Sequence, residues 1–359
     1  MKFSLLPFAA AAAFVFGLTS VSQATIWTVS NDANRPAQFT NLNDAHDAAS
    51  SGDTILVTGS STYYPNLDVY KPLTIIGEGI AGGPTARMSY LYFRRLNNAL
   101  SSSGSRVYGM AVDYLNIYPY FSGSAAGEEV LEDYIIERCD IYSLTLQAGS
   151  GEHIENVTVR NSRITGGLSA YGTSGTSNSS NVIISNNVFS NAYINSSGET
   201  NNTWLIQNNL FLNRTSGVFS SSPSELVIEN NIFYKAEPTG AVNSIFNNNL
   251  TFLCNNGDLP YGSNVGSGNI INENPLLADY PELGGVNHSF DHDYSLLAGS
   301  PAEGTGTNST DIGLGGGNAP VANIPMYPAI PAVTVLDIPV SSVPVGGTLQ
   351  VNIEAISRN

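Results

Sequence analysis

The chain contains a repeated segment in which two asparagines separate two short apolar runs. The segment reads NVIISNNVF, then WLIQNNLF, then LVIENNIF, with a weaker earlier copy, VTVRNSRI, at 157–164. The central apolar residue of each copy recurs every 22 to 25 residues, at Ile136, Val159, Ile184, Ile206 and Ile228. A fixed period of this length is typical of a solenoid, in which each repeat stacks on the one before it.

The repeats favour β-strands over helices. Their apolar runs are short and rich in β-branched and aromatic residues, and they lack the 3.6-residue period of an amphipathic helix. A second apolar column follows the asparagines, at Ile141, Ile164, Phe189, Phe211 and Phe233. Asparagine tolerates left-handed backbone geometry, and its amide can bond to the amides above and below, so we expect it at the corners. The sequence therefore predicts an all-β fold, a parallel β-helix of about a dozen coils.

The amino-terminal part predicts a leader followed by a cap. Residues 1–24 have a lysine, an apolar run and small residues before a cleavage site, as in a secretory signal peptide. Residues 39–52 have the spacing of a short amphipathic helix, with Leu42, Ala45 and Ala49 on one face and His46 expected to be exposed. Such a helix would cover the open strand edge at the first coil.

Several motifs together resemble those of a known superfamily. They are GDTILV at 52–57, LTIIGEG at 73–79, the asparagine repeats and a closing run, NIINENPLLADY…DYSLLAGSPAEGTGTNSTDIG, within 269–313. Residues 25–315 resemble the pectate-lyase-like, right-handed parallel β-helix superfamily, in its secreted bacterial branch. The resemblance implies a right-handed helix whose closing run lies at the last coils. It implies no single activity, because the superfamily includes lyases, hydrolases, epimerases, adhesins and structural proteins.

The motifs divide the chain into a signal peptide and three further parts. We expect the β-helix and its cap over 25–318, a proline-rich linker over 319–332 and a β-strand tail over 333–359. The tail has two strand patterns around a Val-Gly-Gly turn and is too short to bury a core alone. We expect it to dock on the last coil or to pair with a partner, and capping, anchoring and sorting roles stay open.

Composition excludes some classes of function. Removal of the leader takes away Lys2 and changes the net charge from −16 to −17, with 12 Lys and Arg left. A nucleic-acid groove therefore has no electrostatic basis. No later window is long and apolar enough to span a bilayer, so we expect a secreted or cell-surface protein of undetermined oligomeric state. Cys139 and Cys254 lie several coils apart, which favours two buried thiols over a disulfide.

Candidate catalytic residues come from the vertical alignment of the repeats. A lyase on this fold needs a cation, often Ca²⁺ held by carboxylates, and an Arg or Lys base; a hydrolase needs two carboxylates. Glu137 aligns with Arg160 and Asp140 with Arg163, each pair 23 residues apart. The alternative is that these residues form solvated ion pairs. Metal ligands stay unknown, and we assign the metal-like cluster in FDHDY, 290–294, to structure.

Aromatic residues provide the remaining signal. Tyr114, Tyr118 and Tyr120 lie on a strand pattern in the first third of the chain and could stack on sugar rings. The alternative is that they pack or mediate self-association. The sequence favours a protein that binds, or cleaves, a polysaccharide or surface glycan, with a non-catalytic structural or adhesive protein as the alternative. Carboxylates clustered with an unpaired arginine favour the enzyme, and one-to-one ion pairs favour the structural protein.

Overall fold

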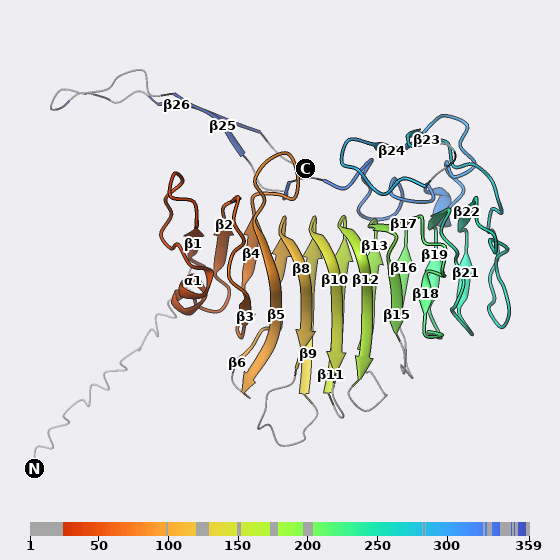
Figure 1. Cartoon of the computed structure of the whole chain (residues 1–359), viewed down its shortest axis with the longest axis horizontal. Helices are drawn as coiled ribbons and strands as arrows, with labels where there is room; N and C mark the ends of the chain where they lie inside the picture. The colour runs from red at the N-terminus through yellow and green to blue at the C-terminus, as the bar shows by residue number, and fades with distance from the viewer. Residues whose placement is uncertain are drawn as a thin grey trace, which may run out of the picture.

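The computed structural model describes residues 24–97, 100–119, 129–148, 152–172, 179–196, 204–281, 283, 285–325, 327–328, 332–337, 346, 348 and 351–356. Apart from Ala24, the expected signal peptide lies outside these residues. The described chain is a parallel β-solenoid whose coils each contribute one strand to each of two long sheets (Figure 1). The expected fold class, a parallel β-helix, is confirmed.

The first sheet forms one wall of the solenoid. Its strands, in spatial order, are β1 (Ile26–Val29), β2 (Thr54–Val57), β4 (Thr74–Gly77), β7 (Arg106–Tyr108), β9 (Glu129–Glu137), β11 (Glu152–Arg160), β13 (Ser179–Ser185), β16 (Trp204–Gln207), β19 (Val227–Glu229) and β21 (Ile245–Asn247).

The second sheet forms the opposite wall. Its path runs through β3 (Leu67–Val69), β5 (Arg87–Asn97), β8 (Ala111–Tyr118), β10 (Asp140–Ala148), β12 (Arg163–Gly172), β14 (Val188–Ser190), β17 (Leu210–Leu212), β20 (Ile232–Tyr234) and β22 (Leu250–Phe252). Three short strands join it from the side: β6 (Leu100–Ser101), β15 (Tyr193–Ser196) and β18 (Phe219–Ser220).

The core lies between the two walls, and its register is the one that the repeats predict. Val159 pairs with Ile136 on one side and Ile184 on the other, and the column continues through Ile206 and Ile228. On the facing wall Phe189, Phe211 and Phe233 stack with ring centroids 4.7 and 4.9 Å apart. These side chains are almost fully buried, and each coil therefore extends the same hydrophobic core.

The paired asparagines have two distinct roles. The first of each pair, with Arg138 in the earliest coil, has a left-handed φ of 50° to 55°: Asn161, Asn186, Asn208, Asn230 and Asn248. The second of each pair points inward and is buried, and its backbone N–H donates to the side-chain oxygen of the asparagine in the next coil: Asn187, Asn209, Asn231 and Asn249. We call these sets the outer and inner asparagine columns. The outer column turns the backbone, and the inner column satisfies buried polar groups.

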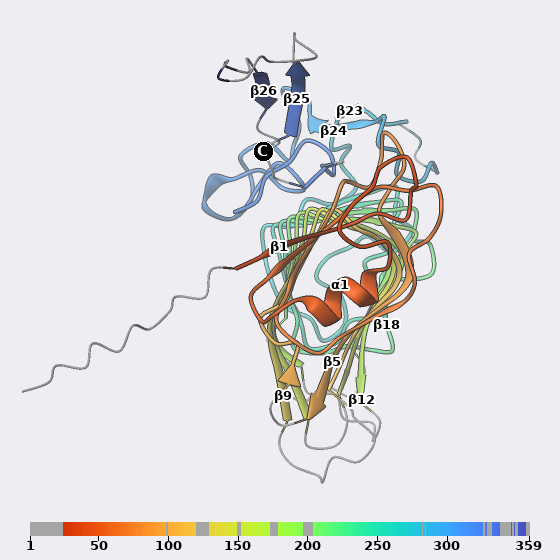
Figure 2. The same ribbon diagram turned by 90° about the vertical axis from the view of Figure 1, so that its left-hand side faces the viewer.

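A helix covers the first coil. Helix α1 (Leu42–Ala48) closes the end of the solenoid, with Leu42 and Ala45 buried (Figure 2). The expectation that His46 is exposed is wrong, since it is only 6% exposed and packs beside Tyr70. Burial lowers the pKa of His46, although its hydrogen bond with Asp47 opposes this shift.

The expected number of coils, about a dozen, is too high. The first sheet has ten strands in the described part of the chain, and one of these, β1, belongs to the cap. The closing run begins on a last partial coil, where Asn269 and Ile270 bond to Asn249 and Leu250 of the coil before, and it then turns back over the side of the solenoid (Figure 1). We call residues 273–304 the closing segment; it holds the small antiparallel sheet of β23 (Leu277–Asp279) and β24 (Asp293–Leu296).

The next described residues, 305–325 and 327–328, form a strap that runs along the outer asparagine column. The strap begins with a short 3₁₀ helix (Thr307–Ser309) at Asn230, since the Thr307 N–H donates to Asn230 Oδ1 at 2.9 Å. Towards the first coils, the side-chain amides of Asn208, Asn186 and Asn161 donate to strap carbonyls, including those of Gly313, Gly316 and Ala319.

The tail follows the strap towards the early coils and not to the last coil, which was one of the two placements expected for it. Tyr327 lies against Gly82, and Pro328 lies against Gly109, beside the early coils. Beyond them β25 (Ala332–Asp337) and β26 (Asn352–Ile356) pair antiparallel with each other. The tail therefore forms the two expected strands but does not lie on the last coil (Figure 1).

The two cysteines are free thiols, as expected. Cys139 is fully buried and Cys254 is half-buried. Burial raises the pKa of Cys139 to about 12 and that of Cys254 to about 11, so neither is a reactive thiolate near neutral pH. Within the described ranges, no helix is both long and apolar enough to cross a membrane.

Candidate functional site

The four candidate catalytic residues form two separate ion pairs. Arg160 Nε and Nη2 both donate to Glu137 Oε2, at 2.9 and 2.7 Å. Arg163 donates to Asp140 from Nε at 2.8 Å and from Nη2 at 2.5 Å. The first pair stands at the ends of β9 and β11, and the second at the starts of β10 and β12. The corner at Arg138 lies between them, so the four side chains do not converge on one site.

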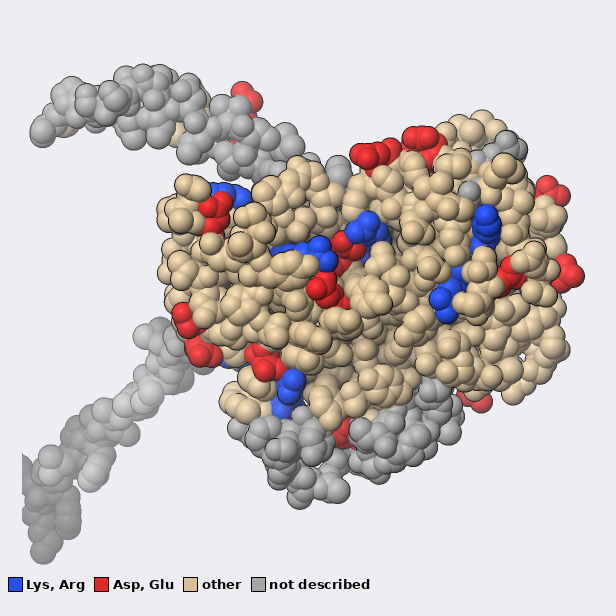
Figure 3. Space-filling model, in the orientation of Figure 1, with Lys and Arg blue, Asp and Glu red and all other residues tan. Residues whose placement is uncertain are grey.

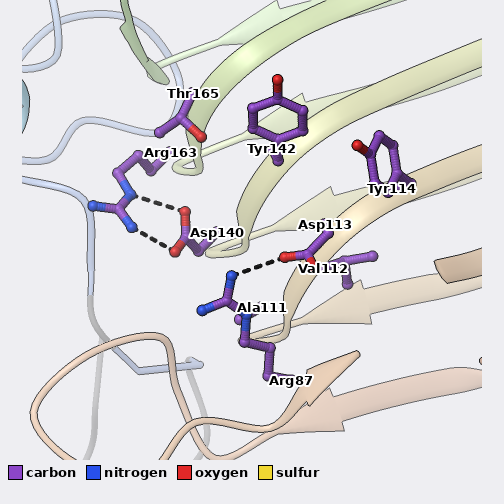
Figure 4. A pocket seen from close by; sticks show the side chains of 9 residues that line it. All are labelled: Arg87, Ala111, Val112, Asp113, Tyr114, Asp140, Tyr142, Arg163 and Thr165. Carbon is purple, nitrogen blue, oxygen red and sulfur yellow. Dashed lines mark hydrogen bonds and ion pairs between the residues drawn. The ribbon is translucent and has the colours of Figure 1, made fainter. Parts of the chain in front are cut away.

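The Asp140–Arg163 pair belongs to a hollow on the outer face of the second sheet. A second pair, Arg87 and Asp113, lies beside it, with Arg87 Nη2 2.8 Å from Asp113 Oδ1 (Figure 4). The hollow has a volume of about 380 Å³ and also contains Tyr114, Tyr142 and Thr165. The hydrogen bond with Asp113 raises the pKa of Arg87, which therefore stays charged.

Tyrosines form one side of the hollow. Tyr90 and Tyr114 are register partners on β5 and β8, and their rings stack with centroids 4.9 Å apart. Tyr142 meets Tyr114 edge to face at 5.7 Å. Tyr142 lies in a β-bulge of β10, where the register shifts between Ile141 and Ser143. The bulge turns the Tyr142 ring outward, leaving it 51% exposed beside Tyr114 at 38%.

The other two candidate tyrosines do not join this cluster. Tyr118 lies farther along β8, where it pairs in register with Arg94, and it does not line the hollow. Tyr120 lies outside the described residues. Of the three tyrosines expected to bind substrate, only Tyr114 is placed at the hollow.

The closing segment lies against the opposite side of the hollow. The Arg163 guanidinium lies over the ring of Phe290, 4.8 Å from its centroid. Next to Phe290 is His288, which is 7% exposed and lies with Nε2 3.0 Å from Asn323 Oδ1. Burial lowers the pKa of His288 to about 4, so it is neutral near pH 7. Phe290 thus holds the Arg163 guanidinium, and His288 beside it adds no charge at neutral pH.

The metal-like sequence beside Phe290 has hydrogen-bonding roles. Asp293 Oδ1 accepts from the backbone and hydroxyl of Ser295, and these bonds lower the pKa of Asp293. His292 Nδ1 lies 3.2 Å from the Tyr294 hydroxyl. Where the structure describes the chain, three or more His, Cys, Asp or Glu side chains are nowhere arranged to hold a metal ion.

Sequence reasoning missed five residues of this site: Arg87, Asp113, Tyr142, Thr165 and Phe290. Arg87 and Asp113 lie on earlier coils than the aligned repeats, although their separation of 26 residues is close to the period. Tyr142 depends on a bulge, which no periodic pattern shows. Phe290 reaches the site only because the closing segment turns back.

No protein-family model matches the chain, and no curated protein matches it. Two solved structures of the PL6-family alginate lyase AlyGC are similar in fold. One, a point mutant, is 14% identical, with a TM-score of 0.24, and the match covers 63% of this chain and 48% of that chain. The other has 14% identity, a TM-score of 0.25 and coverage of 67% and 51%. The chain therefore spans about half the length of the structures it matches.

Proposed function

We propose that the outer face of the second sheet binds a neutral polysaccharide at the hollow between the coils. The exposed Tyr114 and Tyr142, with the half-buried Tyr90 stacked on Tyr114 and two ion pairs beside them, are the observation that carries this proposal. Aromatic faces stack on the C–H faces of sugar rings, and charged side chains bond to hydroxyl groups. Thr165 adds a hydroxyl to the same hollow.

The charges of the hollow support a neutral ligand. Its lining has two arginines and two aspartates, and each arginine is paired with one aspartate. A uronate would have to displace one of these carboxylates and approach a chain of net charge −16. Figure 3 shows basic and acidic groups next to one another in the middle of a largely uncharged face. A neutral glycan meets neither obstacle.

The same pairing favours binding over cleavage. A hydrolytic general acid has to be protonated before it can donate to the glycosidic oxygen. It also has to reach that oxygen, and the Asp113 and Asp140 carboxylates each accept hydrogen bonds from an arginine instead. A lyase also needs a base that is free to accept a proton. Arg87 and Arg163 are each engaged in an ion pair with an aspartate.

A structural or adhesive surface protein is the second candidate function. Ion pairs between coils also occur outside the hollow, at Arg35–Glu78 and Arg94–Asp68. Such one-to-one pairs stabilise the wall of a rod and need no ligand.

Either function fits our proposal that the protein is exported through a signal peptide at residues 1–24. The mass of the protein recovered outside the producing cells tests export: cleavage after Ala24 is expected, and an intact leader in the cell pellet contradicts it.

The binding test uses residues 25–359 and a panel of neutral and acidic polysaccharides in affinity electrophoresis. An aromatic contact contributes about 0.5–1.5 kcal/mol, so loss of two rings in Tyr114→Ala/Tyr142→Ala should weaken binding about tenfold. Tyr171→Ala is the matched control, because Tyr171 is 40% exposed on β12 but does not line the hollow.

Reducing ends and unsaturated products are measured in the same samples. Retention by a neutral glycan without products supports the proposal. Tighter binding of acidic glycans that is lost in Tyr114→Ala/Tyr142→Ala contradicts its charge argument, and products from any glycan contradict its non-catalytic part. Failure to bind any member of a broad panel favours the structural candidate.

A further inference from the structure

A second groove lies across the corner from the hollow, between the first sheet and the strap. One side is formed by Glu137, Arg138 and Arg160 at the ends of β9 and β11. The other side is formed by strap residues 318–323 and 325. The groove has a volume of about 530 Å³, within the usual range for small-molecule sites. It shares no lining residue with the hollow.

The charge of this groove differs from that of the hollow. Its lining has two arginines, Arg138 and Arg160, and one acidic residue, Glu137. Arg160 binds Glu137 Oε2, and Arg138 Nε lies 3.4 Å from Glu137 Oε1. Two guanidinium groups thus lie at one carboxylate, and the lining residues include one more basic than acidic side chain. This local excess is notable in a chain of net charge −16.

The two arginines are held in different ways. The Arg138 side chain is 11% exposed, and its Nη1 donates to the Tyr327 carbonyl of the strap at 3.4 Å. The Arg160 side chain is 37% exposed, so a solute can reach it. An anion binding here would meet one fixed and one accessible guanidinium at the rim of a protein groove. Such charge-assisted hydrogen bonds are stronger than neutral ones.

The strap gives the groove an apolar side. Ala319, Pro320, Val321 and Ala322 stand in sequence along it. Asn161 Nδ2 donates to the Ala319 carbonyl at 3.0 Å, and the Val321 N–H donates to the Leu314 carbonyl at 2.9 Å. These bonds fix the strap against the corner. An anion with a carbon skeleton can therefore place its charge at the arginines and its carbons against the strap.

We infer that this groove is a binding site for a small organic carboxylate, separate from the glycan site. The carboxylate lies between Arg138 and Arg160 and competes with Glu137 for their donors. The inference does not rest on the proposed glycan binding, because it uses other residues and another class of ligand. A result at one site therefore leaves the other untouched.

Isothermal titration calorimetry of residues 25–359 tests the inference, with galacturonate, its uncharged analogue galactose, and inorganic sulfate as probes. Saturable binding of galacturonate, at least tenfold tighter than that of the other two, is expected. Arg160→Gln should weaken galacturonate binding at least tenfold. Glu137→Gln should strengthen it several-fold, because it removes the competing carboxylate. Arg106→Gln, an exposed arginine on the neighbouring strand β7, is the matched control and should change nothing.

Four outcomes would overturn the inference. They are no saturable binding of galacturonate, equal binding of galactose, equal binding of sulfate, and an unchanged affinity in Glu137→Gln. Circular dichroism checks that each variant is folded. If Arg160→Gln does not fold, Glu137→Gln still tests the inference. If Glu137 had only a structural role, its substitution would not increase the affinity for galacturonate.

Discussion

Asn209 bonds to the coils on both of its sides. Its N–H donates to Asn231 Oδ1 at 2.9 Å, and its Oδ1 accepts from the N–H and side-chain amide of Asn187. Its own amide also donates to the Ile184 carbonyl at 2.8 Å. Asn209→Ala leaves buried groups of both neighbours without partners, each costing about 1–3 kcal/mol. We expect a loss of about 3 kcal/mol in unfolding free energy, measured by urea denaturation.

Gln207→Ala is the control for this substitution. Gln207 lies two residues away on β16 and is half-buried on the outer side of the wall. A change within about 0.5 kcal/mol is expected there. Equal losses in the two variants would show that the inner asparagine column contributes nothing specific to stability.

His288 predicts a pH dependence of stability. Its pKa is about 4 in the folded protein against an ordinary 6.5, because burial disfavours the charged form, and Asn323, Arg163, Asp140 and His292 surround it. Above pH 6.5 the histidine is neutral in both the folded and the unfolded state, so it does not reduce the free energy of unfolding. Between pH 6.5 and pH 4 only the unfolded chain gains the proton. The free energy of unfolding therefore decreases as the pH is lowered, by up to about 3 kcal/mol.

The measurement is the thermal unfolding midpoint at pH 4.5 and pH 7. His288→Asn should reduce the difference between the two midpoints. His153→Asn, a half-buried histidine on the outer side of β11, should leave it as in the parent. If His288→Asn keeps the whole difference, the acid sensitivity arises from other groups.

At the residue scale, the sequence predicts contacts that recur at the same position in successive coils. It misses contacts that occur in one coil only. The Ile136 column and the Glu137–Arg160 contact follow from a fixed period. Tyr142 faces outward only because of a bulge, and His46 is buried only because Tyr70 of the next strand region packs against it. Neither cause leaves a periodic signal in the sequence.

At the scale of elements, the strap depends on glycine where it crosses the outer asparagine column. A Cβ on Gly316 would lie 1.9 Å from the Asp311 carbonyl oxygen and 2.5 Å from Asn208 Nδ2. A Cβ on Gly315 would have its nearest contact at 3.4 Å. Gly316→Ala should therefore displace the strap and cost about 1–3 kcal/mol, as overpacking does. Gly315→Ala is the matched control.

Limited proteolysis followed by mass spectrometry measures this difference. Faster cleavage within 305–328 is expected for Gly316→Ala alone. Equal cleavage rates in both alanine variants would show that the strap tolerates the clash by moving elsewhere. The strap also shows the limit of sequence reasoning about elements. The sequence predicts a linker only from residue 319, and only the contacts of residues 313–316 with Asn186 and Asn208 show why glycines are needed before it.

At the scale of the whole molecule, the strap connects coils that are not neighbours. In a solenoid each repeat contacts only the next, so stability is a sum of local terms and the ends can open independently. Here one segment bonds to Asn230 near one end and approaches Gly82 and Gly109 near the other. The strap therefore couples the opening of distant coils. We expect the intact protein to unfold in one cooperative transition.

Two truncations separate the strap from the tail. A chain ending at residue 331 keeps the strap and should retain one urea transition with an unchanged slope. A chain ending at residue 304 loses the strap contacts of Asn161, Asn186, Asn208, Asn230 and Asn248. Its transition should broaden, and hydrogen exchange should quicken first in β19 to β22, because these coils lie at the end without a helix cap. Identical exchange and identical slopes in the two chains would show that stacking alone makes the solenoid cooperative.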